Sequence, residues 1–69
     1  MSQYKFYATL RDGSVQWYPV FVTIDADTRD EAIKSMADEN DLTVVEQDAN
    51  SVWMQMWDGA LVKYDVSLV

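Results

Sequence analysis

The residues of this chain that could do chemistry are mainly carboxylates, and most of them lie in one segment. Twelve of the 69 residues are Asp or Glu, and residues 25–48 hold nine of those twelve together with two bases, Arg29 and Lys34. The formal charge of this segment is therefore 2 − 9 = −7, which equals the net charge of the whole chain. Paired carboxylates can act as general acid and base when a pocket raises one pKa, or they can bind a hard cation. An exposed group of carboxylates can instead attract a basic partner.

The residue types around these carboxylates argue against catalysis and against a metal centre. The chain contains no histidine and no cysteine, which are the usual general bases, activated nucleophiles and soft metal ligands. An EF-hand loop starting at Asp25 would need an oxygen ligand at its fifth position and a glutamate at its twelfth, where this chain has Arg29 and Met36. Both glycines follow an aspartate in a turn-like dipeptide, so no phosphate-binding glycine-rich loop is formed. We therefore expect no catalytic residue, metal or cofactor, and a binding protein rather than an enzyme.

Charge and hydropathy narrow the class of partner and the compartment. A strongly acidic chain is not expected to bind DNA, RNA or an anionic membrane directly, because these are held by clustered Lys and Arg. The longest apolar run, residues 17–22, includes a proline and is far shorter than the roughly 18 residues of a membrane-spanning helix. The N-terminal residues alternate in polarity and do not resemble a signal peptide. We expect one soluble, cytoplasmic domain over residues 1–69.

The first third of the chain predicts two antiparallel strands. Residues 3–10 alternate between apolar and polar types, and residues 15–26 are rich in β-branched and aromatic residues. The sequence allows two loops between these strands: a two-residue Asp12-Gly13 turn, or a three-residue loop, residues 11–13, with left-handed Gly13. The two loops place opposite faces of the second strand beside the apolar face of the first. We prefer the three-residue loop, because it unites one apolar face: Tyr4, Phe6, Ala8, Leu10, Tyr18, Val20, Val22 and Ile24. Pro19 cannot donate to a ladder and marks an edge position or a bulge.

A single amphipathic helix is predicted over residues 28–39. Thr28 and Glu31 have the spacing of a capping box, in which the hydroxyl and the carboxylate satisfy free N–H groups at the start of the helix. Four apolar residues recur at helical spacing and should face the core: Ala32, Ile33, Met36 and Ala37. The helix should end near Asn40, a residue type that tolerates the left-handed conformation common after helices.

Three further strands, residues 42–46, 52–57 and 60–68, complete the predicted fold. Asp58-Gly59 is the strongest short hairpin signal in the chain. With a two-residue turn there, the core face of the last hairpin would hold Trp53, Gln55, Trp57, Ala60, Val62, Tyr64, Val66 and Leu68. The fold class is therefore α+β, with ββαβββ order and one helix packed on one face of an antiparallel sheet that can curl around it.

The acidic segment gives the first candidate site. Asp30 in the first helical turn suits the helix dipole and can pair with Lys34, whereas Asp38, Glu39 and Asp41 gather at its negative end, where each costs a few tenths to about 1 kcal/mol. Helix stability does not explain these later acids, so they are either a solvated face or a docking surface for a basic partner. The candidate residues are Asp30, Asp38, Glu39, Asp41, Glu46 and Asp48.

The sheet face opposite the predicted core gives the second candidate site. With the turn lengths above it would carry Tyr7, Trp17, Phe21, Met54 and Met56. Exposed apolar patches of several hundred Å² usually mark an interface, which would make the protein a homodimer or a small interaction module. In the other interpretation, the tryptophans and methionines fill the core of a curled sheet. A salt-resistant dimer would favour this surface, and a monomer with salt-sensitive partner binding would favour the acidic one.

Residues 20–33, VFVTIDADTRDEAI, form a strand that leads through a short acidic turn into a capped helix. This unit resembles one common in small phage and mobile-element proteins. Together with the hairpin over residues 53–64, the order of elements is similar to that of some small anti-CRISPR proteins. The resemblance implies a phage-encoded, non-catalytic inhibitor in the host cytoplasm. Its partner would be a host defence protein, of CRISPR or restriction type. Some such inhibitors are acidic mimics of nucleic acid that would dock on a basic surface, and others bind through different surfaces.

Overall fold

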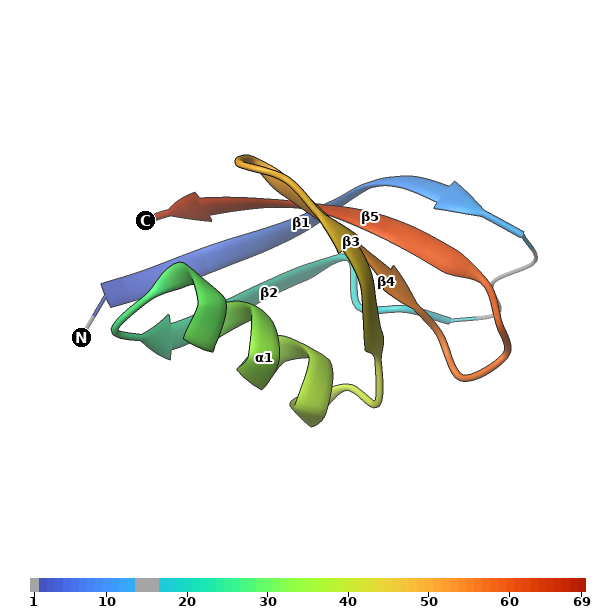
Figure 1. The fold of residues 1–69 in the computed structure, drawn as a ribbon, viewed down its shortest axis with the longest axis horizontal. Helices are drawn as coiled ribbons and strands as arrows, with labels where there is room; N and C mark the ends of the chain where they lie inside the picture. Colours follow the sequence, from blue (N-terminus) through green and yellow to red (C-terminus); the bar gives the residue numbers. More distant parts are fainter. Residues whose placement is uncertain (1, 14–16) are drawn as a thin grey trace.

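The computed structural model describes residues 2–13 and 17–69, which form a two-layer domain of one sheet and one helix (Figure 1). The elements are β1 (Ser2–Asp12), β2 (Phe21–Ala26), α1 (Arg29–Glu39), β3 (Thr43–Gln47), β4 (Ser51–Gln55) and β5 (Leu61–Leu68). Every strand pair is antiparallel, and the spatial order is β2-β1-β5-β4-β3. The predicted α+β class and ββαβββ order are confirmed.

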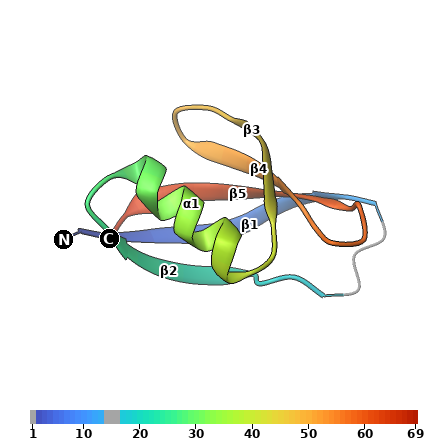
Figure 2. The ribbon, with the colours of Figure 1, turned by 60° about the horizontal axis from the view of Figure 1, so that its bottom comes forward.

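The helix lies on one face of the sheet and contacts both edge strands, β2 and β3 (Figure 2). This is possible because the sheet is strongly twisted, so that β3 and β4 cross the direction of β1 and β5 in Figure 1. The predicted helical stripe, Ala32, Ile33, Met36 and Ala37, is buried in the core. Below it lie the fully buried side chains of the sheet: Phe6, Val52, Met54, Val62 and Tyr64. In the part of the chain that the structure describes, α1 is too short and too polar to cross a membrane.

The connection between β1 and β2 is longer than predicted, although the shared face is correct. Phe6 pairs with Val22, whereas a three-residue loop would have paired Phe6 with Tyr18. The true register is displaced by four residues, and because side chains alternate with period two, an even displacement keeps the same face inward. The strand therefore begins at Phe21, and Val15, in the predicted strand, lies outside the described residues. Gly13 does have a positive φ, of +96°.

The long connection is held by contacts to its neighbours. The Tyr64 hydroxyl donates to the Pro19 carbonyl at 2.7 Å, and the Ala8 N–H donates to the Val20 carbonyl at 2.9 Å. Burial raises the pKa of the Tyr64 phenol, so this hydroxyl stays a donor. Pro19 precedes the edge strand β2, as its missing N–H requires. Two predicted core residues, Leu10 and Val20, are at least half exposed here.

The turn between β4 and β5 has three residues instead of two, and this reverses the predicted faces of β4. The Met56 N–H donates to the Ala60 carbonyl at 2.7 Å, so residues 57–59 form the loop, and Gly59 has a φ of +91°. Since a shift of one residue exchanges the two faces of a strand, Met54 and Met56 are buried in the core. Trp57, predicted inside, is 77% exposed, and Trp53 is only partly buried on the opposite face.

Candidate acidic docking site

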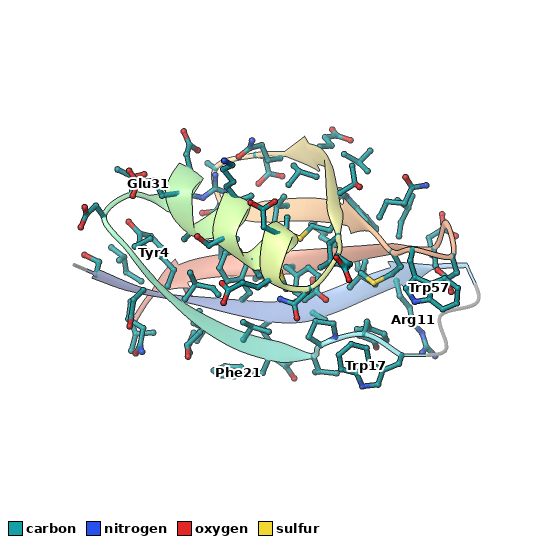
Figure 3. The ribbon with its side chains drawn as sticks, turned by 90° about the horizontal axis from the view of Figure 1, so that it is seen from below. Tyr4, Arg11, Trp17, Phe21, Glu31 and Trp57 are labelled. Carbon is teal, nitrogen blue, oxygen red and sulfur yellow. The ribbon has the colours of Figure 1, made fainter. Side chains whose placement is uncertain are left out.

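The first turn of α1 leaves the Glu31 carboxylate exposed. Thr28 caps the helix as predicted, and its hydroxyl accepts a hydrogen bond from the Glu31 N–H at 3.2 Å. The reciprocal half of the capping box is not formed, because the Glu31 carboxylate has no partner among the residues that the structure describes. Figure 3 shows Glu31 at the opposite end of the molecule from Arg11 and Trp57. Glu31 is therefore one of the exposed acids, whereas its capping-box spacing in the sequence had predicted a structural role for its carboxylate.

The C-terminal end of α1 is closed by a Schellman-type arrangement. The Leu42 N–H donates to the Ala37 carbonyl at 2.9 Å, and the Asn40 side-chain amide donates to the Met36 carbonyl at 2.9 Å. The helix ends at Asn40 as predicted, but the left-handed residue is Asp41, with a φ of +57°. This position usually holds glycine. Asp41 is thus unfavourable twice, through its backbone conformation and through its charge at the negative end of the dipole.

We expect Asp41→Gly to stabilise the domain by about 1 kcal/mol, because glycine removes both the left-handed strain and the unfavourable charge. Urea unfolding at neutral pH measures this change. Asp41→Asn separates the two contributions, since it removes the charge and keeps a side chain. A glycine variant no more stable than the wild type would mean that Asp41 has a compensating contact.

Two of the predicted site residues line one open groove between α1 and β3. The groove has a volume of about 360 Å³ and is lined by Asp30, Ile33, Lys34, Ala37, Asp38, Leu42, Thr43, Val44 and Gln47. Asp30 and Asp38 lie eight residues apart, about 12 Å along the helix. No ion pair joins Lys34 to either aspartate among the described residues. The groove combines an apolar floor with carboxylates, so it suits a long basic side chain that has an apolar stem.

The other predicted acids lie outside this groove. Glu46 pairs with Trp53, because a bulge at Val45 turns it to the sheet face away from α1. Glu39 is exposed on α1 and, like Glu31 and Asp41, does not line the groove. The acidic surface that the structure brings to the helix layer consists of Asp30, Glu31, Asp38, Glu39 and Asp41. We call these five residues the helix acids. Among the described residues, none of their carboxylates has a hydrogen-bond or ion-pair partner.

Asp48 has a structural role in the turn between β3 and β4. Its carboxylate accepts hydrogen bonds from the N–H groups of Asn50 and Ser51, both at 2.9 Å, and from the Ser51 hydroxyl at 3.0 Å. These bonds hold the pKa of Asp48 below its ordinary value. The Arg29 guanidinium donates to the Asp48 and Ser51 carbonyls and so ties this turn to the start of α1. The charge of Asp48 is thus explained by the fold.

The pKa of Asp48 predicts an acid-dependent contribution to stability. Because the folded-state pKa lies below the ordinary value of 3.8, the contribution is present above pH 3.8 and is lost as the pH falls through the lowered pKa. Asp48→Asn should therefore lower the urea midpoint at neutral pH, and the difference from the wild type should narrow in acid. A difference independent of pH would show that the charge of Asp48 does not contribute.

The second predicted site is only partly assembled. Met54 and Met56 belong to the core, so they cannot form a partner surface. Tyr7 and Phe21 are exposed and pack edge to face, with ring centroids 6.3 Å apart. Trp17 is 70% exposed and precedes β2, along the same border of the molecule as Phe21 in Figure 3.

The described residues contain no group of three or more His, Cys, Asp or Glu side chains arranged to hold a metal ion. No family model matches the chain, and no match was found among the curated proteins or the solved structures.

Proposed function

We propose that this chain is a non-catalytic binding protein whose helix acids dock on a basic, nucleic-acid-binding surface of another protein. The observation that carries the proposal is the set of five exposed carboxylates around α1 without partners among the described residues. One of them, Asp41, occupies a backbone conformation that favours glycine. A residue retained against both backbone and dipole preferences is more readily explained by binding than by stability.

The groove between α1 and β3 supports a basic partner in particular. An arginine or lysine from the partner would lay its aliphatic stem on Ile33, Ala37 and Leu42 and bring its charge to Asp38. Arginine fits best, because its planar guanidinium can bind a carboxylate through two hydrogen bonds. A surface rich in such side chains is the kind that binds nucleic-acid phosphates.

In its specific form, the proposal is a phage-encoded inhibitor of a host defence complex, of anti-CRISPR or anti-restriction type, acting in the host cytoplasm. Docking would exclude DNA or RNA, because the helix acids would occupy the partner's Lys and Arg side chains that otherwise bind nucleic acid. This form rests on the order of the elements and on the acidic surface.

The test is affinity capture from bacterial lysate with the immobilised wild-type chain, at low and at high salt. We expect retained proteins to bind nucleic acid, to dissociate as the salt concentration rises, and to be displaced by added duplex DNA or by RNA. Purified candidates then allow a direct competition assay against a labelled oligonucleotide. A captured protein that binds the chain and nucleic acid simultaneously, with unchanged affinities, would contradict the proposal.

A further inference from the structure

The sheet face away from α1 carries large apolar side chains that no described element covers. Tyr7 and Phe21 are 53% and 58% exposed there. The bulge in β1 between Ala8 and Leu10 turns Leu10 to the same face, where it is 56% exposed and pairs with Lys63. Lys63 pairs in turn with Trp53 on β4. We call this sheet face the outer face; its side chains include Tyr7, Leu10, Phe21, Trp53, Lys63 and Asp65.

The size of the outer face matches that of a stable interface. The domain measures 35 × 20 × 18 Å, and Figure 3, seen from below Figure 1, shows the sheet spread along the longest and the shortest of these dimensions with α1 in front of it. The face therefore covers about 600 Å², within the range of roughly 600–1,000 Å² that each partner contributes to a standard protein–protein interface. Fully buried aromatic side chains cover about 150–250 Å² each, so half-exposed Tyr7 and Phe21 offer considerable apolar area.

The distribution of charge favours a second copy as the occupant. Two copies related by a twofold axis bury the same patch of each, so the patch must be complementary to itself. The helix acids fail this condition, because like charges would oppose each other. The outer face meets it, since Lys5 and Lys63 lie among Asp25, Asp65 and Glu46, so that bases of one copy can face acids of the other. Packing through the outer faces also leaves the two sets of helix acids on opposite sides of the assembly.

We propose that the outer face binds a second copy of this chain and forms a twofold, sheet-to-sheet dimer. Sheets stacked in this way lie about 10 Å apart and interdigitate their side chains. Tyr7 on β1 and Phe21 on the edge strand β2 form the main aromatic contact of each copy. The dimer presents two acidic docking surfaces that point away from each other. It does not depend on the proposed function of the helix acids, because the two surfaces share no residue.

The test measures association of the purified full chain by sedimentation velocity over a wide range of concentration. We expect the wild type to dimerise, and Tyr7→Asp or Phe21→Asp to weaken the dimer by roughly 30-fold each, as loss of an aromatic anchor of an interface does. The matched control is Trp57→Asp, which removes the most exposed aromatic side chain of the described chain, outside the outer face. It should leave the dissociation constant unchanged.

Circular dichroism establishes that each variant is folded. If an aspartate disturbs the strands, Tyr7→Thr and Phe21→Thr replace the aspartate variants, because threonine has a high β propensity. A wild type that stays monomeric at every concentration would overturn the proposal and leave the outer face to another protein. A dimer that the outer-face variants leave intact, or that Trp57→Asp disrupts equally, would overturn it as well.

Discussion

Replacing Asp38, Glu39 and Asp41 by lysine is expected to abolish partner binding while the fold stays intact. All three side chains are exposed, and none has a partner among the described residues, so no internal contact is lost. Each replacement turns an attraction to a basic surface into a repulsion. At about 1 kcal/mol or less per exposed pair, the three reversals together should lower the affinity by roughly 100-fold or more. The remaining binding should also depend less on salt concentration, because fewer charge pairs are formed.

The fold should tolerate this change, because lysine at the C-terminal end of a helix interacts favourably with the dipole. Lysine at Asp41 keeps the left-handed strain, so we expect the free energy of unfolding to change by about 1 kcal/mol or less. Calorimetric or surface-based binding measurements with the captured partner, paired with urea unfolding, separate the two effects.

A control with the same change in net charge distinguishes a local site from general electrostatics. Replacing Asp12, Asp25 and Glu46 by lysine also raises the formal charge from −7 to −1, but it does so on the sheet instead of the helix. This variant should keep most of the affinity. Because Asp25 and Glu46 lie on the outer face, both triple variants are compared at a concentration where the chain is monomeric. Equal losses in the two triple variants would mean that only the overall charge matters, and unchanged binding in the first would refute the acidic site.

The helix could be predicted because its signals are local. A cap residue, a stripe of four apolar side chains and a polar end lie within one short stretch, and each agrees with the others. The structure confirms all of them and corrects two details: the Glu31 carboxylate does not complete the capping box, and the left-handed residue is Asp41 instead of Asn40. The sequence does not choose between these two residues, because both Asn and Asp tolerate the left-handed conformation. The choice depends on the hydrogen bond from the Leu42 N–H to the Ala37 carbonyl.

The strand faces could not be predicted to the same degree, because both turns contain Asp-Gly. This dipeptide fits a two-residue turn and also ends a three-residue loop in which glycine is left-handed. Hydrophobicity did not separate the alternatives in β4, where Met54 and Trp53 are both apolar. In β2, by contrast, Val22 and Ile24 alternate with Thr23 and Asp25, and the face was correct although the loop length was wrong.

The candidate site was predictable in composition but not in arrangement. The acids of residues 25–48 are plain in the sequence, but the bulge at Val45 sends Glu46 to the outer face. The side-chain hydrogen bonds of Asp48 remove it from the site. Bulges and turn caps depend on the strands paired beside them, so they follow from the fold and not from spacing. Glu31 was missed because its cap spacing already explained it.

The register of β4 decides which of two neighbouring residues, Met54 or Trp53, supports the core. Met54 is fully buried between α1 and the sheet and pairs with Val62, which is also fully buried, whereas Trp53 lies partly exposed on the outer face. Met54→Ala should therefore destabilise the domain by about 2–5 kcal/mol through lost burial and a cavity. For a domain of this size, whose total stability is on the order of 3–10 kcal/mol, much of the chain would unfold.

Trp53→Ala removes a larger side chain but should cost less than Met54→Ala, because Trp53 lies outside the core. Met54→Leu conserves volume and should cost under about 1.5 kcal/mol, which separates burial from any special role of the thioether. Urea unfolding at low protein concentration, where association does not contribute, ranks the three variants. A two-residue Asp58-Gly59 turn requires the opposite order, with Trp53→Ala the most damaging, so the ranking decides between the two registers and the faces that depend on them.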